Sequence, residues 1–395
     1  MRKQLLIPLL TLSVLLIVTV LVILYGTGYR FTFDKGRPDL SGTGLLVATS
    51  TPDGAQVFIN DHLTTATDNT INLAPGTYDV KITKEGYFSW EKQIVVKKEV
   101  VAKADAFLFP TAPKLENITS IGVDKPVLDP TQTKIAYDVS SQSAVTKRGI
   151  YILDMSARPI LTLQSAATQI VDDTLGNFST STLNWSPDAS QIIATVSGQT
   201  SYLLSARGFN QSPQDITETI ASIHADWDKQ EADKEKARLD ALPSKLRPVV
   251  VSNFDILSWS LDETKILYKA KGNSDLPIII NPRLIGANST PEQRSIKKDS
   301  VYVYDIKEDR NYKILDSLPA TTRPLSWFPD SAHLIYVHDQ KVDVMEYDGQ
   351  NITTVYAGPF INDYVFPWPD ATKIVILTNL GNPNIPANLY TIVLK

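Results

Sequence analysis

The sequence predicts an all-β protein in which a small β-sandwich precedes a β-propeller of about five blades. One N-terminal transmembrane helix and one helical insertion complete the expected fold. Three observations lead to this prediction: an uncharged stretch at the N-terminus, many short alternating segments bounded by turn residues, and a short phrase that returns five times after residue 112. The chain has 395 residues and is 43% hydrophobic, so it can bury more than one core.

The N-terminus begins with the basic residues Arg2 and Lys3, which precede an uncharged stretch, Leu5–Leu24. A stretch of this length is about what a helix needs to cross ~30 Å of hydrocarbon, and it exceeds the apolar core of most cleaved signals. Residues 1–33 are therefore predicted to be a cytoplasmic start, a transmembrane helix and an aromatic flank. A cleaved signal peptide with a long core is the alternative. The prediction gives a single-pass cell-membrane protein whose C-terminal bulk is extracytoplasmic.

A polar linker is expected at residues 34–43, and a small β domain at residues 44–110. The segment Thr77–Lys84 alternates between apolar and polar side chains, which is typical of an antiparallel strand with one dry and one wet face. The turn Thr51-Pro52-Asp53-Gly54 and the later Pro75-Gly76 separate such strands. Short strands between glycine and proline turns predict a small sandwich.

The same segment carries motifs of a known family. Pro52-Asp53-Gly54-Ala55, the run from Leu73 through Gly76 to Val80, and Glu85-Gly86-Tyr87 occur in order. Together they resemble the PEGA domain, with aspartate where the name-giving motif has glutamate. The resemblance implies an extracytoplasmic β-sandwich attached to other domains, with no catalytic residues to transfer.

From residue 112 to 395 the chain repeats one unit: an apolar or aromatic run, a Pro-Asp turn, polar residues and an apolar strand. In every copy the first apolar strand residue follows the proline position by five residues. A fixed offset at irregular intervals indicates one supersecondary unit with variable loops. The blade-forming hairpin residues are predicted to be Trp185, Pro187, Asp188, Trp259, Asp262, Trp327, Pro329, Asp330, Pro369 and Asp370.

The spacing of the copies predicts the blades. The proline positions 130, 187, 261, 329 and 369 lie 57, 74, 68 and 40 residues apart, while a bare blade needs about 40–45. The three longer intervals must therefore contain insertions, and a sixth, degenerate blade could lie in one of them. A fourth strand of the blade is predicted at Pro159–Leu163, Tyr312–Leu315 and Thr353–Tyr356. The last repeat lacks its fourth strand, which Leu115–Ile121 could supply to close the ring.

The Trp-Ser-Pro-Asp phrase resembles the WD-like propellers of the TolB type, although the first copy lacks the tryptophan and the third has Leu261 in place of proline. The resemblance implies the fold and says nothing about activity. The roles of the repeated residues are expected to be structural. Proline presets the turn, aspartate bonds to the turn backbone, and tryptophan fills the gap between neighbouring blades.

Two insertions interrupt the repeats. In residues 212–244, Ser212 and Pro213 resemble a helix start, and Pro243 a helix end. The segment is expected to form one helix of roughly seven turns or a helical hairpin. It either lies with its apolar stripe on a blade or acts as a docking element or lid over the channel. Residues 271–298 predict a long loop. Four apolar residues spaced along one helical face are the candidates for partner docking: Ile216, Ile220, Ile223 and Trp227.

The composition and motifs argue against several functions. A net charge of −5 and a pI near 5.5 do not suit a nucleic-acid partner, and the absence of cysteine excludes disulfides and thiolate chemistry. His333 and His338 flank one strand on opposite faces and do not predict a metal pair. No nucleophile, phosphate-binding or dinucleotide motif occurs. The sequence therefore predicts no catalytic residue, metal or cofactor.

The function expected from these features is a membrane-anchored extracytoplasmic protein that presents a propeller for protein or cell-envelope binding, without catalysis. The alternative is a propeller hydrolase or lyase that acts on envelope polysaccharide or peptide, which needs two carboxylates converging in the channel. Asp129, Asp172 and Asp173 are the candidates for that alternative. A purely structural surface-layer role is the third reading.

Overall fold

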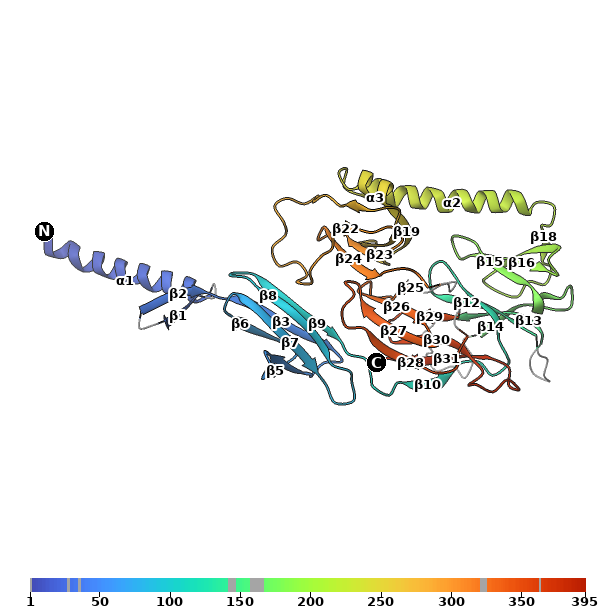
Figure 1. Ribbon diagram of the computed structural model, residues 1–395, viewed down its shortest axis with the longest axis horizontal. Helices are drawn as coiled ribbons and strands as arrows, with labels where there is room; N and C mark the ends of the chain where they lie inside the picture. Colours follow the sequence, from blue (N-terminus) through green and yellow to red (C-terminus); the bar gives the residue numbers. More distant parts are fainter. Residues whose placement is uncertain are drawn as a thin grey trace. The chain divides into compact units, whose positions relative to one another are not determined.

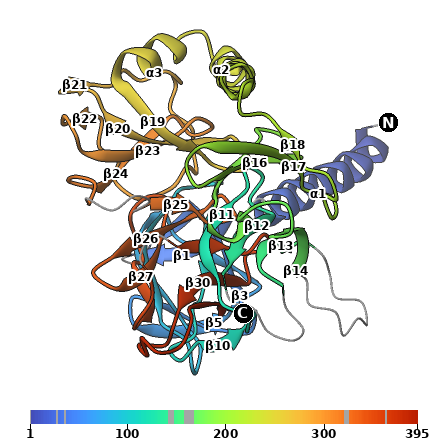
Figure 2. The same cartoon turned by 90° about the vertical axis from the view of Figure 1, so that its right-hand side faces the viewer.

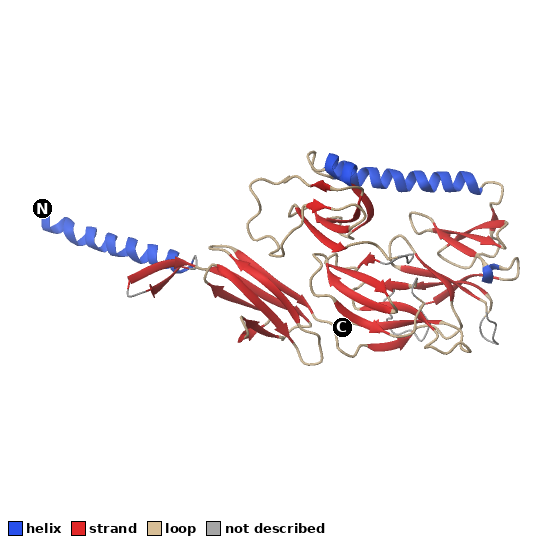
Figure 3. Ribbon diagram, viewed as in Figure 1, coloured by secondary structure: helices blue, strands red, loops and turns tan. Residues whose placement is uncertain are grey.

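The computed structural model describes residues 2–26, 29–34, 37–140, 147–156, 167–319, 325–361 and 364–395. The chain forms two compact units, which are treated separately below (Figure 1). Unit 1 comprises Met1–Phe109 and Ile280–Pro291, and unit 2 comprises Pro110–Ile279 and Glu292–Lys395. Strands dominate both units, and the longest helices are α1 in unit 1 and α2 in unit 2 (Figure 3).

The N-terminal part of unit 1 is a helix followed by a hairpin. The helix α1 spans Arg2–Gly26, and β1 (Tyr29–Asp34) pairs with β2 (Arg37–Gly42) in antiparallel register. Most of the linker expected at residues 34–43 is therefore a strand, because the aromatic strand before it offers backbone partners for its amides and carbonyls. Among the described residues, no helix is long and apolar enough to cross a membrane, so the structure does not support the predicted transmembrane helix.

The remainder of unit 1 is a sandwich of two sheets, one of three strands (β6-β3-β9) and one of four (β5-β4-β7-β8). Leu46, Val57, Ile82 and Trp90 fill its buried core, together with the alanines of β9. The strands β3 and β9 run parallel, and the other pairs are antiparallel. The strands are β3 (Gly44–Thr51), β4 (Gln56–Ile59), β5 (His62–Ala66), β6 (Asn69–Leu73), β7 (Gly76–Thr83), β8 (Trp90–Val96) and β9 (Val101–Phe107).

In the described residues, unit 2 contains five four-stranded antiparallel sheets, which we number I to V. Four consecutive antiparallel strands per sheet are the blade pattern of a β-propeller, and the number of blades stays a prediction. Sheet I holds β11 (Asp124–Leu128), β12 (Lys134–Val139), β13 (Gly149–Asp154) and β14 (Ala167–Asp172). Sheet II holds β15 (Thr182–Trp185), β16 (Gln191–Val196), β17 (Thr200–Ser205) and β18 (Gln214–Asp215).

Sheet III is interrupted along the chain by the small pair β21 (Ser274–Asp275) and β22 (Ser295–Ile296). The strand predicted at Pro159–Leu163 lies outside the described residues. Sheet III holds β19 (Phe254–Trp259), β20 (Lys265–Ala270), β23 (Val301–Asp305) and β24 (Arg310–Leu315). Sheet IV holds β25 (Leu325–Trp327), β26 (His333–His338), β27 (Lys341–Glu346) and β28 (Thr353–Ala357).

Sheet V joins the two ends of unit 2. Its strands are β29 (Val365–Pro367), β30 (Lys373–Thr378), β31 (Asn388–Val393) and β10 (Lys114–Asn117). The first strand of unit 2 pairs with the last, from Lys114 opposite Val393 to Asn117 opposite Tyr390. The closing strand expected from Leu115–Ile121 is thus confirmed, although it ends at Asn117.

Neighbouring sheets share apolar cores. Sheets I and II meet through Ile150 and Ile192, and sheets I and V through Tyr137 and Val375. Sheets III and IV meet through a cluster that contains Leu267. In Figure 2, α2 is seen nearly end-on beside the strands of sheet III. Burial of both faces of the central strands accounts for their near-continuous apolar runs.

The first insertion differs from its prediction. Ser212 and Pro213 do not begin a helix, because Gln214 and Asp215 pair with Leu203 and Tyr202 as the fourth strand of sheet II. The helix α2 spans Ile220–Ala241, and a second helix, α3, spans Arg247–Asn253. The backbone hydrogen bonds that this segment forms at the edge of sheet II outweigh the local preference of Ser212 and Pro213 for a helix start. The second insertion is largely loop, as predicted, apart from β21 and β22.

Candidate functional site

The repeated hairpins have one conformation. Each aspartate after the proline position accepts a hydrogen bond from the backbone N–H two residues later, at 3.1 Å for Asp188, 3.2 Å for Asp262, 2.9 Å for Asp330 and 3.0 Å for Asp370. Hydrogen bonds from Ser186 and Ser190 hold the pKa of Asp188 below its ordinary value. These aspartates therefore serve their own turns.

The residue after each of these four aspartates is left-handed, and so is Gln132, which follows Thr131 in the first copy; the sequence did not reveal this. Turns of this kind favour glycine at the left-handed position, yet none of the five residues is glycine. Each costs conformational energy that the turn must offset. The residues are Gln132 (φ 57°), Ala189 (φ 57°), Glu263 (φ 54°), Ser331 (φ 58°) and Ala371 (φ 58°).

The tryptophans before the turns contact different partners. The Trp185 indole N–H donates to the carbonyl of Val127 at 3.1 Å, which links sheet II to sheet I. The Trp259 indole N–H instead donates to Glu235 of α2, at 3.0 and 3.1 Å to the two carboxylate oxygens. Trp327 is buried in the core between sheets III and IV. The tryptophan position of the repeat therefore makes a different contact in each of these three copies.

The helix α2 is fixed at both ends and charged between them. Its first half packs on sheet II, where Trp227 joins Ile193 and Ile216 in one buried cluster. Its last residues approach sheet III, where Leu239 packs with Leu242. The four docking candidates lie at this first contact: Ile216 and Trp227 are buried, and Ile220 and Ile223 pack against them. These side chains attach α2 to its sheet, and a docking role for them stays a prediction.

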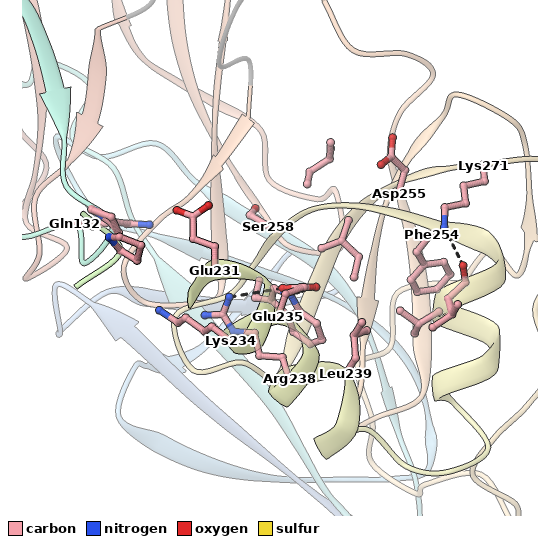
Figure 4. Close-up of a pocket in the computed structure, with 17 residues that line it drawn as sticks. Gln132, Glu231, Lys234, Glu235, Arg238, Leu239, Phe254, Asp255, Ser258 and Lys271 are labelled. Carbon is pink, nitrogen blue, oxygen red and sulfur yellow. Dashed lines mark hydrogen bonds and ion pairs between the residues drawn. The ribbon is translucent and has the colours of Figure 1, made fainter. Parts of the chain in front are cut away.

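A pocket of about 740 Å³ lies between α2, α3 and β19. Every residue of β19 lines it, and the turn prolines Pro130 and Pro187 belong to its wall. Figure 4 shows Gln132 and Glu231 toward one end and Lys271 toward the other. A concave site of this size is in the range that binds ligands. We call it the α2–β19 groove.

The centre of the groove is held by a charged cluster. Glu235 accepts the Trp259 N–H, and the Arg238 guanidinium lies over the Trp259 ring at 5.9 Å from its centroid. Arg238 also pairs with Glu263 at 2.8 Å, while Lys271 donates to the carbonyl of Val251 at 2.8 Å. These contacts fix the side chains in position before any partner arrives.

The groove also presents exposed apolar side chains. Val251 of α3 is 55% exposed, and Leu257 of β19 is 40% exposed. Leu257 is the extra residue of a β-bulge, because Ile256 pairs with Tyr268 and Ser258 with Leu267. A bulge re-aims a side chain and increases the local twist of the strand. No feature of the sequence indicated the bulge.

The three carboxylates considered for catalysis each make contacts with nearby residues. Asp129 accepts the backbone N–H of Thr133 at 2.7 Å, Asp172 pairs with Lys147 at 3.2 Å, and Asp173 accepts the Ser179 N–H at 2.8 Å. None of the three lines the groove. Among the described residues, no group of three or more histidine, aspartate or glutamate side chains could hold a metal ion.

Comparisons with known proteins give one family match and several similar solved structures. Residues 43–111 match the family model of the PEGA domain, which confirms the resemblance found for residues 44–110. No curated protein matches the chain. The structure is similar to a putative TolB from Agrobacterium tumefaciens, at 12% identity and a TM-score of 0.23, over 68% of this chain and 78% of that one.

Two further solved structures are similar. TolB from Acinetobacter baumannii is 12% identical, with a TM-score of 0.22, over 80% of this chain and 59% of that one. A chain of the mitotic checkpoint complex is 11% identical, with a TM-score of 0.33, over 73% of this chain and 96% of that one.

Proposed function

We propose that this chain is a cell-envelope protein that binds a protein partner in the α2–β19 groove and catalyses no reaction. The observation that carries the proposal is the groove itself, in which a helix fixed at both ends lies along one side of a complete strand. Loops and inserted segments positioned by a rigid scaffold commonly carry binding function.

The lining supports a protein partner. Exposed apolar side chains such as Val251 and Leu257 lie beside a tryptophan, an arginine and charged residues. Aromatic and arginine side chains at the centre with polar groups around them are typical of protein interfaces. The PEGA match adds a second β module of unknown partner to the same chain.

The charged groups of the groove support a binding role over a catalytic one. Glu235 is held by Trp259, and Asp255 pairs with Lys269 at 3.3 Å. A glycosidase needs one carboxyl group to donate a proton and another to attack or activate water. We therefore do not favour the hydrolase or lyase alternative.

Site-specific photo-crosslinking in intact cells tests the proposal. A benzoylphenylalanine at Val251 or Leu257 is expected to capture one discrete protein, and the same residue at Ile352, which is 59% exposed and directly precedes β28, is the control. Capture from both groove positions and not from the control supports the proposal. Identical products at all three positions, or none from the groove, would contradict it.

The cellular location is also a proposal. We propose that residues 44–395 lie outside the cytoplasm and that the N-terminal segment attaches the chain to the membrane. Support comes from the basic start, the uncharged stretch Leu5–Leu24, and the exposure of α1 side chains such as Leu10, Leu15 and Val22. Protease added to spheroplasts should digest residues 44–395, and deleting residues 2–26 should move the protein out of the membrane fraction. Full protection from protease would refute this location.

A further inference from the structure

The inference below rests on the proposed function and names the chemistry of the partner. The strand β19 lies at the edge of sheet III, whose order is β19-β20-β23-β24. In the part of the chain that the structure describes, its ladder is with β20 alone. An edge strand presents a row of backbone N–H and C=O groups that another strand can bind.

The backbone bonds around β19 show which groups face outward. The Lys271 N–H donates to the Asn253 carbonyl at 2.9 Å, whereas the Ala270 N–H donates to Ser300 on the opposite side, at 3.0 Å. Because Phe254 stands opposite Ala270, its backbone groups point away from β20, but its N–H already donates to the carbonyl of Val250 in α3, which leaves the Phe254 carbonyl at the free edge. Antiparallel pairing alternates, so the backbone of Ile256, opposite Tyr268, also points to the free edge.

The other end of the strand gives the same result. The Ser260 N–H donates to the Lys265 carbonyl at 3.0 Å, which places Ser260 toward β20. Its neighbour Trp259, opposite Ile266, then directs its backbone to the free edge. The free edge therefore offers backbone groups from both halves of β19, on either side of the Leu257 bulge.

The groove follows this edge along its length. All six residues of β19 line it, which corresponds to about 20 Å at the usual rise of a strand. The facing residues of α2 are Glu231, Lys234, Glu235 and Arg238, which recur at helical spacing on one side of the helix. A slot with a strand edge on one side and a helix face on the other fits an extended chain.

The charges of the slot indicate the composition of its occupant. Glu235 and Arg238 already have partners, while Glu231 and Lys234 form no hydrogen bond or ion pair with another described residue. These two groups have opposite signs and lie three residues apart. They complement a segment of low net charge better than a strongly acidic or basic one.

We propose that the partner inserts an extended segment of about five or six residues, with low net charge and apolar side chains at alternate positions, as an added strand on the free edge of β19. Main-chain hydrogen bonds supply affinity in this mode, and side-chain pockets supply specificity. The alternate apolar side chains contact Val251 and Leu257, and the polar ones face Glu231 and Lys234.

The probe is a phage-displayed library of random eight-residue peptides, selected on the purified full-length chain. We expect enriched peptides of low net charge that slow hydrogen exchange in residues 254–259. N-methylation at every second amide of such a peptide should weaken binding at least tenfold, and methylation of the intervening amides should change it less than threefold. That period of two is specific to strand addition.

A matched pair of variants adds a second readout. Leu257→Glu should weaken the selected peptide at least tenfold, whereas Ile352→Glu should leave its affinity unchanged, because Leu257 lines the groove and Ile352, an equally apolar exposed residue directly before β28, does not. Loss of helical or strand content in Leu257→Glu is checked by circular dichroism, and the N-methyl scan on the unaltered chain does not depend on that variant.

Several outcomes would overturn the inference. These are an empty selection, binding without the two-residue period, protection outside the groove, or dimers of this chain that protect β19 without peptide. Failure of strand addition is distinguishable from failure of the proposed function. Photo-crosslinking at Val251 still captures a protein if the partner binds the groove in another way, and captures none if the groove binds no protein.

Discussion

Substitution of Trp227 by alanine should release the first half of α2 from sheet II. The middle of α2 is charged, and a helix of this kind depends on tertiary contacts, since isolated helices are marginal in water. Trp227 is the buried residue of α2 and is 7% exposed. Truncation of a buried tryptophan to alanine costs about 3–5 kcal/mol.

That cost should appear as local opening of the helix. At about 1.36 kcal/mol per factor of ten, it corresponds to an increase in amide exchange of roughly 100- to 5,000-fold in the first half of α2. Exchange in β12, which lies in a different core, should stay unchanged. Trp227→Phe retains an aromatic ring and should give a smaller increase.

Hydrogen exchange followed by mass spectrometry measures this effect peptide by peptide. Lys229→Ala, at an exposed position of the same helix, is the matched control and should leave exchange unchanged. If Trp227→Ala left the amide exchange of residues 220–241 unchanged, the apolar cluster would not hold α2 on sheet II. The helix could then not serve as a fixed wall of the groove.

Three further changes have defined outcomes. Burial raises the pKa of Asp138 to about 8, although the positive charge of Lys125 lowers it, while an unfolded aspartate titrates near 3.9. Between these two values the native state keeps a proton that the unfolded state releases. The free energy of unfolding should therefore fall as the pH rises from about 4 to 8, by up to about 1.4 kcal/mol per pH unit. Asp138→Asn should flatten that slope in urea titrations, and an unchanged slope would contradict it. Trp259→Phe removes the bond to Glu235 and should cost about 1–2 kcal/mol, read as faster exchange at the end of α2, with equal exchange as the opposing result. Gln132 has a left-handed backbone and a buried side-chain oxygen without a hydrogen-bond partner. Gln132→Gly should therefore stabilise the protein by about 1 kcal/mol, which is measured as a higher thermal midpoint. A lower midpoint would show that the Gln132 side chain stabilises the turn.

Local signals allowed much of the fold to be predicted from the sequence. Proline presets the turn and aspartate bonds to it within a few residues, so the hairpin at Pro187 could be recognised without knowledge of the rest of the chain. Alternation in β7 likewise marked Val80 and Ile82 as core residues, which are buried. Such features depend on neighbours in the sequence.

The groove could not be predicted because it depends on contacts between distant residues. The bond between Glu235 and Trp259 joins residues 24 positions apart, and the Leu257 bulge exists only relative to β20. The segment around Gln214 is polar and short, so neither composition nor periodicity marked it as a strand. Its ladder with β17 decided its conformation, and the helix begins at Ile220, seven residues after Pro213, where the sequence suggested its first turn.

The pairing of β10 with β31 has a consequence for biosynthesis. The strand at Lys114–Asn117 leaves the ribosome well before its partner at Asn388–Val393 is made. Sheet V therefore cannot be completed until β31 has been made, and β10 waits for some 270 residues with an unpaired edge. Such long-range closure slows folding, and the exposed edge invites aggregation in the meantime. We expect the nascent chain to need a chaperone or rapid export during that interval, more than a chain whose sheets pair in sequence order.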